Sequence, residues 1–298
     1  SGKDLRKLII PLIIEQILAI AVGMADTIMV SAAGEAAVSG VSLVDTVNIL
    51  LINVFSALAT GGAVVSGHFL GKKKREDACK SAWQILLFAT LLAFVISVIF
   101  ITAHDPLLRL MFGKIEDDVM KASKTYLIIT TYSFVALAIY NSCAALFRAM
   151  NESKVTMWVS LLMNVINVVG NAICIYGLHM GVAGVAIPTT ISRYVAAVVI
   201  FLLMFQTKKE INLCGQITWK FNGSLIKKIL YIAIPNGLEN SMFQLGKILV
   251  MSAVATMGTS AIAANAVTGT IANWNNLPGF AINLAIVSVV SVCVGAGR

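Results

Sequence analysis

Long apolar runs separated by short polar segments make up most of the chain. Several of these runs exceed thirty residues, so their helices must tilt, bend or protrude from a bilayer. Eight runs reach the length of about 20 residues that a membrane-spanning helix needs, at residues 8–31, 37–69, 82–103, 120–147, 155–177, 182–206, 228–256 and 260–294. The pattern predicts an all-α polytopic membrane protein with eight transmembrane helices.

The composition supports this interpretation. Of the 298 residues, 58% are apolar and 12% are charged, whereas soluble domains are about 45–50% apolar and about 25% charged. So little charge cannot coat a soluble surface of this size. A cytosolic enzyme, a disordered regulator and a secreted disulfide-rich domain are therefore excluded. The five cysteines are scattered and form no CxxC pair, so we interpret them as packing residues.

The charged residues predict an orientation. With the N-terminus taken as cytoplasmic, sixteen of the 22 Lys and Arg residues fall in inside segments and four in outside segments. Cytoplasmic loops of membrane proteins carry such an excess of cations. We therefore expect a multi-pass protein of the cell (inner or plasma) membrane with both termini cytoplasmic. The net charge of +8 is a topology signal, and nucleic acid is not expected as a partner.

A weak internal repeat connects the two ends of the chain. A shift of 224 residues lays the first two apolar runs on the last two without a gap, and pairs Pro11 with Pro235 and Gly71 with Gly295. An even number of predicted spans separates the copies, so the repeats are parallel, as in many carriers. The second copy holds two spans up to Arg298, and we expect its lobe to be incomplete in this chain.

Four segments resemble the multidrug and toxic compound extrusion (MATE) transporters, and together they cover essentially the whole chain. They lie at residues 8–44, 146–177, 181–193 and 234–250. The resemblance implies twelve helices in two six-helix lobes, with a central cleft formed largely by helices 1, 2, 7 and 8. It divides this chain into a first six-helix lobe, a cytoplasmic linker and the first two helices of a second lobe, at residues 1–206, 207–227 and 228–298.

Asp26 lies about 18 residues into the first span, where a charge costs about 2.5–3.5 kcal/mol and needs a reason. It could bind a proton or sodium ion, or it could be a packing residue hydrogen-bonded to its neighbours. Some members of the resembled family carry Asp where this chain has Asn171, which favours protons over sodium here. Asp45 and Arg193, in two other spans, could pair locally and are assigned no mechanism. The resemblance implies that Asp26 belongs to a cation site with Tyr126, Asn167, Asn171 and Thr189.

A second group of polar residues is expected to face the central cleft. Glu15 and Glu239 hold the same place in the two copies, and could form an acidic pair that attracts cationic substrates. Alternatively, each could reach the interface or accept from a nearby Lys or Asn. Related transporters often carry a carboxylate one turn deeper in helix 7, beside Gln244 here. We expect Lys247 to pair with an acid, for which Asp26 is the candidate, either as a conformational latch or as a static ion pair.

The sequence contains none of the enzyme motifs that would contradict a transporter. HExxH, P-loop and GxSxG motifs are absent, and His68, His104 and His179 are far apart in the sequence. We expect no enzyme, no metal, no ATP and no cofactor besides a coupling ion, H+ or Na+. The sequence predicts a secondary active exporter of small organic, cationic and amphipathic molecules that works by alternating access. The alternatives are a lipid-linked glycan flippase of a related family and a truncated, inactive or partner-dependent membrane subunit.

Overall fold

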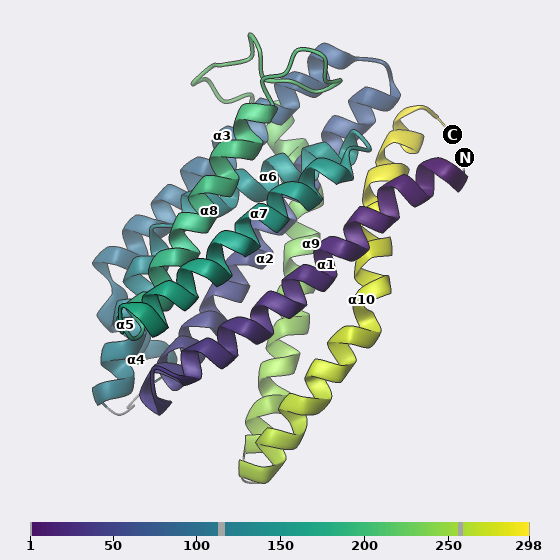
Figure 1. The fold of residues 1–298 in the computed structure, drawn as a ribbon. Helices are drawn as coiled ribbons and strands as arrows, with labels where there is room; N and C mark the ends of the chain where they lie inside the picture. Colours follow the sequence, from purple (N-terminus) through teal and green to yellow (C-terminus); the bar gives the residue numbers. More distant parts are fainter. Residues whose placement is uncertain (1, 113–116, 256–258, 298) are drawn as a thin grey trace.

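The computed structural model describes residues 2–112, 117–255 and 259–297, and every regular element in these ranges is a helix (Figure 1). Apolar stretches inside a bilayer form helices because a helix satisfies its backbone hydrogen bonds internally where no water is present. In chain order these are α1 (Gly2–Ser31), α2 (Glu35–Gly71), α3 (Arg75–Thr102), α4 (His104–Phe112), α5 (Asp117–Thr131), α6 (Phe134–Ala149), α7 (Ser153–Ala172), the π-helical turn η1 (Ile173–Gly177), α8 (Ala183–Leu203), α9 (Gly223–Ala255) and α10 (Thr259–Gly295).

Each predicted span corresponds to a helix or to a pair of helices. Six of the described helices are long and apolar enough to cross a membrane, and the bent pair α5–α6 would make a seventh. The helix α9 is not among them, because its middle is polar, with Asn236, Glu239, Asn240 and Gln244. The chain is thus a multi-pass α-helical protein, and the number of eight transmembrane helices stays a prediction.

The span predicted at 120–147 is broken in two. The helices α5 and α6 meet at a bend of 50°, although no Pro or Gly stands there. Neighbouring helices bond the groups at the break. The Tyr194 hydroxyl donates to the Tyr132 carbonyl oxygen at 2.6 Å, and Arg193 Nη1 donates to Ser133 Oγ at 2.8 Å. A broken helix is tolerated inside a membrane where such contacts satisfy its backbone.

The two copies of the internal repeat pack against each other. The helix α2 packs on α9 and on α10, and α1 packs on α10. Where α2 and α10 end, a Cβ atom on Gly71 would overlap the Val292 carbonyl oxygen, and one on Gly295 would overlap that of His68. Only glycine permits two backbones to approach so closely. Gly71 and Gly295, paired by the repeat, therefore face each other.

The remaining contacts between the copies follow the same relation. A Cβ atom on Gly237 of α9 would lie 3.4 Å from the Ala57 Cβ atom of α2. Under the shift of 224 residues these positions correspond to Ile13 and Ala281, which pack in one small apolar cluster between α1 and α10. The α2–α9 and α1–α10 contacts thus share one pair of corresponding positions.

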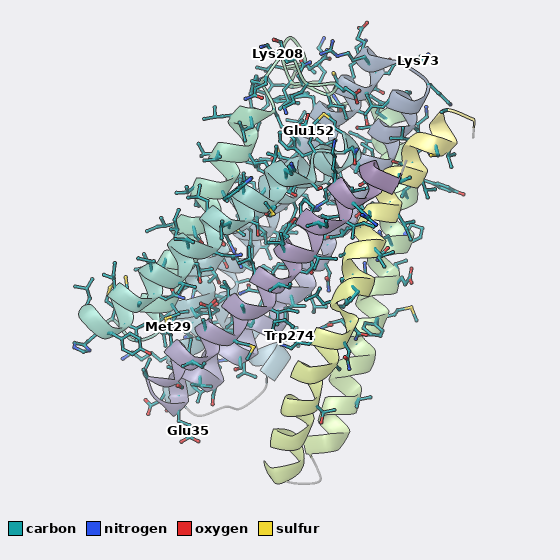
Figure 2. The ribbon with its side chains drawn as sticks, turned by 45° about the vertical axis from the view of Figure 1, so that its right-hand side comes forward. Met29, Glu35, Lys73, Glu152, Lys208 and Trp274 are labelled. Carbon is teal, nitrogen blue, oxygen red and sulfur yellow. The ribbon has the colours of Figure 1, made fainter. Side chains whose placement is uncertain are left out.

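One end of the bundle carries most of the described Lys and Arg residues, with Lys73 and Lys208 labelled there in Figure 2. It holds the α2–α3 turn at 72–74, the segment 204–222 and the first turns of α9, and is called the basic end below. Arg75 fixes the segment by donating to the carbonyl oxygens of Thr207, Lys209 and Glu210 at 2.6–3.0 Å. The opposite end holds the α1–α2 turn and α4.

Candidate cation site

Asp26 lies on α1, little more than one turn before the helix ends at Ser31. Its carboxylate is partly buried and faces α7, where Asn171 Nδ2 donates to Asp26 Oδ1 at 2.8 Å. Asn171 is completely buried, and its Oδ1 atom has no hydrogen-bond partner in the described part of the structure. The Asn171 side chain is therefore held through its amide nitrogen alone.

Asn167 continues this network by one turn of α7. Asn167 and Asn171 are four residues apart, so their side chains share one face of the helix. In the orientation that satisfies both neighbours, the Asn167 amide nitrogen donates to Asp26 Oδ1 at 2.9 Å and its oxygen accepts from Thr189 Oγ1 at 2.9 Å. The structure thus brings together Asp26, both asparagines and Thr189, from α1, α7 and α8.

Tyr126 lies beside this network but bonds to a different acid. Its hydroxyl donates to Asp45 Oδ1 at 3.0 Å, from α5 to α2. Asn48 Nδ2, one turn further along α2, lies 3.5 Å from the same oxygen. Asp45 thus belongs to the candidate site, although the sequence interpretation assigned it no mechanism. The available signal was an acid inside a long apolar run.

A cavity of about 130 Å³ connects the two acids. Asp26, Asp45 and Tyr126 line it, together with Gly23, Ser42 and four valines from α1, α2 and α8. A volume of 10–15 Å³ per water centre is enough to hold a water, so the cavity has room for a cation with water around it. Within the described residues, no group of three or more His, Cys, Asp and Glu side chains could hold a metal ion.

Arg193 of α8 supplies a positive charge near this cavity. It donates to Ser133 Oγ, and it interacts electrostatically with both Asp26 and Asp45. With both carboxylates ionised, the three side chains carry one net negative charge. Such a cluster inside a bundle of apolar helices attracts a small cation, because the surrounding medium screens the charge weakly.

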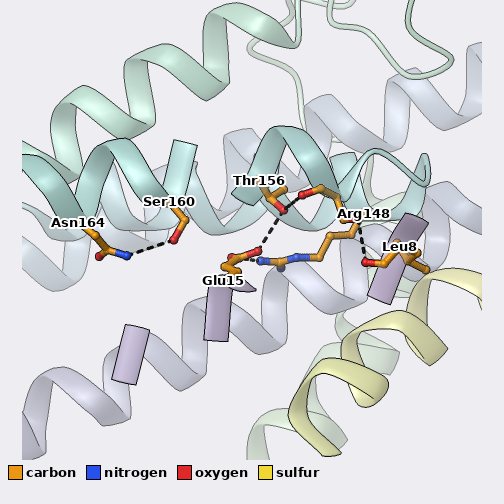
Figure 3. Close-up of polar contacts among 7 residues, drawn as sticks. Leu8, Glu15, Arg148, Thr156, Ser160 and Asn164 are labelled. Carbon is orange, nitrogen blue, oxygen red and sulfur yellow. Dashed lines mark hydrogen bonds and ion pairs between the residues drawn. The ribbon is translucent and has the colours of Figure 1, made fainter. Parts of the chain in front are cut away.

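The second acid of α1, Glu15, is in a different setting (Figure 3). Its side chain is buried, and Glu15 Oε1 accepts from Arg148 Nη2 at 2.8 Å. The Thr156 hydroxyl donates to Glu15 Oε2 at 3.1 Å. Nearby, the Ser153 hydroxyl donates to the Leu8 carbonyl oxygen at 3.0 Å. The cation and the hydroxyl engage both oxygens of Glu15, so this acid is neutralised within α1, α6 and α7.

The other candidate cleft residues lie on α9. Glu239 is exposed and Gln244 is partly buried. Glu15 and Glu239 are thus in different environments, one in a buried ion pair and the other on an open helix face. The side chain of Lys247 lies outside the described residues, as does its expected pairing with Asp26.

Together, fold and site define a class, a multi-pass helical membrane protein with an acidic cavity among its helices. The chain matches the MatE family over residues 11–173 and belongs to that family, whose members are transporters.

Two curated relatives illustrate the match. "Uncharacterized transporter YisQ" of Bacillus subtilis is 28% identical over 278 residues, which cover 92% of this chain and 60% of that protein. "Probable multidrug resistance protein NorM" of Thermotoga maritima is 25% identical over 300 residues, covering 99% of this chain and 64% of that protein. The chain thus spans about three fifths of the length of these relatives.

Solved structures share the fold. An outward-facing multidrug resistance MATE family transporter of the MOP superfamily matches with a TM-score of 0.90 at 22% identity, over 99% of this chain and 65% of the other. A MATE protein in complex with MaL6 matches with a TM-score of 0.91 at 23% identity, with the same coverage.

Proposed function

We propose that the chain is part of a secondary active exporter in the cell membrane, with a cytoplasmic N-terminus. It would move small organic molecules, cationic and amphipathic, outward in exchange for H+ or Na+ by alternating access. Membership of a transporter family and a relative named for multidrug resistance support this proposal. The observation that carries it is the cavity with two carboxylates and one nearby arginine, because a net negative cluster among apolar helices needs a cation.

We infer that Asp26 and Asp45 share the coupling ion. Asp26 is joined to α7 through neutral amides, and Asp45 is joined to α5 through Tyr126. A proton or Na+ that binds between the two acids neutralises a carboxylate charge, and the amide and phenol donors then lose the charge to which they are hydrogen-bonded. The contacts of α1 with α7 then weaken, and a bound cation can favour a different arrangement of α1, as a ligand shifts an equilibrium only through differential affinity.

Transport by the full-length protein in proteoliposomes tests this function. An imposed pH or Na+ gradient is expected to drive the movement of a fluorescent organic cation. Asp26→Asn and Asp45→Asn should abolish that movement. Glu35→Gln is the matched control, because Glu35 is an exposed acid in the α1–α2 region, outside the cavity. Wild-type rates for Asp26→Asn under both gradients would disprove the role of Asp26.

Substrate charge tests the proposed cleft on α9. If Glu239 attracts cationic substrates, Glu239→Gln should weaken the binding of a cationic dye and leave that of a neutral analogue unchanged. A wild-type protein that moves no dye under either gradient, but transfers a lipid-linked sugar between leaflets, would replace the exporter with a flippase. Failure in both assays would favour a partner-dependent or inactive subunit.

A further inference from the structure

A pocket of about 450 Å³ opens between α2 and α9 at the basic end. Three lysines line it, Lys72 following α2, and Lys227 and Lys228 in the first turns of α9. We call it the lysine pocket. It lies at the opposite end of the helix bundle from the α1–α2 turn, and it shares no lining residue with the cavity of Asp26 and Asp45.

The positive charge of the lysine pocket lacks an acidic counterpart. Of the described residues that line it, none is Asp or Glu, and the described ion pairs involve other cations. The Lys228 ammonium instead lies 5.7 Å from the centre of the Phe69 ring, a cation–π contact that leaves its charge unneutralised. Three like charges around one pocket repel each other, and an anion bound among them relieves that repulsion.

The wall of the lysine pocket is apolar. Val65 and Phe69 of α2 and Ile232 of α9 line it, and Tyr231 stands beside them with 83% of its surface exposed. Tyrosine is enriched where membrane and water meet. A free phosphate ion would use the ammonium groups alone, whereas a phospholipid would place its phosphate on the lysines and its glycerol and acyl chains on the apolar wall.

A second basic pocket, of about 540 Å³ between α3 and residues 215–225, provides a contrast. Its Lys80 already pairs with Glu76 at 2.7 Å, and its Trp83 and Gln84 side chains bond to the backbone of Thr218, Lys220 and Asn222. Glu76 therefore neutralises Lys80, and Lys220 is the other lysine of this pocket, so the lysine pocket with its three lysines concentrates more positive charge and is the better anion site.

We propose that the lysine pocket binds the phosphate headgroup of an anionic phospholipid. Basic pockets between transmembrane helices on the cytoplasmic side bind such headgroups in other membrane proteins, and the cation distribution predicts that the basic end is cytoplasmic. One lipid would contact α2 and α9 together, and therefore both copies of the repeat. This proposal does not depend on what the protein transports.

Lipid binding to the full-length protein in detergent tests the proposal. Native mass spectrometry would compare phosphatidylglycerol with phosphatidylcholine of the same chain length. The wild type should retain phosphatidylglycerol preferentially. The variant Lys72→Gln/Lys227→Gln/Lys228→Gln should lose affinity for it on the order of 100-fold, since each lysine near an anionic lipid surface contributes about a factor of five.

Matched variants separate the pocket from general surface charge. Lys73→Gln/Lys74→Gln/Lys208→Gln removes the same charge from exposed sites at the basic end that do not line the pocket, and should bind phosphatidylglycerol as the wild type does. Equal losses in both triple variants would disprove a specific site. Arginine at the three pocket positions should restore binding, and unfolding temperatures in detergent would confirm that each variant is folded.

A soluble competitor distinguishes the two sources of phosphate. Millimolar inorganic phosphate should displace phosphatidylglycerol poorly, and Tyr231→Ala should weaken lipid binding without changing phosphate binding. Displacement by inorganic phosphate at the concentration at which lipid binds would instead assign the pocket to a free anion and overturn the lipid proposal.

Discussion

Two carboxylates on α1, Glu15 and Asp26, are three turns apart and differ in burial, in bonding partners and in access to a cavity. Glu15 is buried and bonded by a cation, Arg148, and by a hydroxyl. Asp26 is partly buried, accepts from neutral amides, and faces a cavity that it shares with a second acid. An acid in a close ion pair holds helices together, whereas Asp26, which shares the charge of Arg193 with Asp45, is available to an exchangeable ion.

This difference separates two roles that an intramembrane acid can have. Glu15 is desolvated when the protein folds, and its ion pair with Arg148 compensates for the cost of that desolvation. The charge of Asp26 is compensated incompletely, so its preferred state depends on what enters the cavity. The following predictions test this contrast, from the largest expected effect to the smallest.

Arg148→Met should lower the free energy of unfolding by about 3–5 kcal/mol, because it leaves the Glu15 charge buried without its partner. Glu15→Gln/Arg148→Met should recover most of that loss, because neither charge then remains. Denaturant unfolding of the full-length protein in detergent measures both values. An Arg148→Met variant as stable as the wild type would show that Glu15 is not held by this ion pair.

Asp26→Asn should change stability by less than about 1 kcal/mol, because an amide can keep one hydrogen bond to α7. Gradient-driven transport should nevertheless fall at least tenfold. Arg148→Met, scaled to the amount of folded protein, should retain ion coupling. Unfolding curves and proteoliposome uptake are measured on the same preparations. A loss of coupling in both variants would show that the Glu15–Arg148 ion pair and Asp26 do not have separate structural and coupling roles.

Tyr126→Phe should shift the concentration of driving cation at half-maximal transport about tenfold downward. The phenol donates a hydrogen bond to ionised Asp45, and bonds to charged groups contribute about 1.5–3 kcal/mol. Without it the free carboxylate is less stable and binds a cation more tightly. Tyr132→Phe, at a half-exposed tyrosine outside the cavity, is the control and should leave the value unchanged.

Asp105, at the opposite end from the basic end, provides a third setting for an acid. The hydrogen bond from Lys124 holds the pKa of this half-exposed carboxyl below its usual range. A lowered pKa in the folded state stabilises the protein above the ordinary value of about 4, and this contribution is lost as the pH falls through the lowered value. Asp105→Asn should therefore lower the unfolding temperature slightly at pH 7, and the difference should vanish in acid.

The sequence predicted the long helices well, because their apolar runs are continuous. The break between α5 and α6 could not be foreseen, since the groups that bond there come from α8: Tyr194 bonds the Tyr132 carbonyl oxygen and Arg193 bonds the Ser133 hydroxyl, 62 and 60 residues away in the sequence. The residues next to the break give no indication of which distant residues will contact it.

The candidate site, too, could be predicted from the sequence only in part. The resemblance to a known family placed Asp26 with Asn167, Asn171 and Thr189, and the structure brings these four together. Asp45 was assigned no mechanism, because its partner Tyr126 is 81 residues away in the sequence. Glu15 was expected to face a cleft, since nothing nearby in the chain shows that Arg148, 133 residues away, reaches it.

The glycine contact between α2 and α10 has a consequence for how the molecule is built. Gly71 and Gly295 occupy the same position in the two copies, and their contacts are reciprocal, because Gly71 meets Val292 and Gly295 meets His68, which also correspond under the shift of 224 residues. The interface is therefore isologous, as in a C2 homodimer, although a single chain forms both sides. In a homodimer, a single substitution would place a bulky residue on both sides of this contact. Here the two glycines can be changed one at a time.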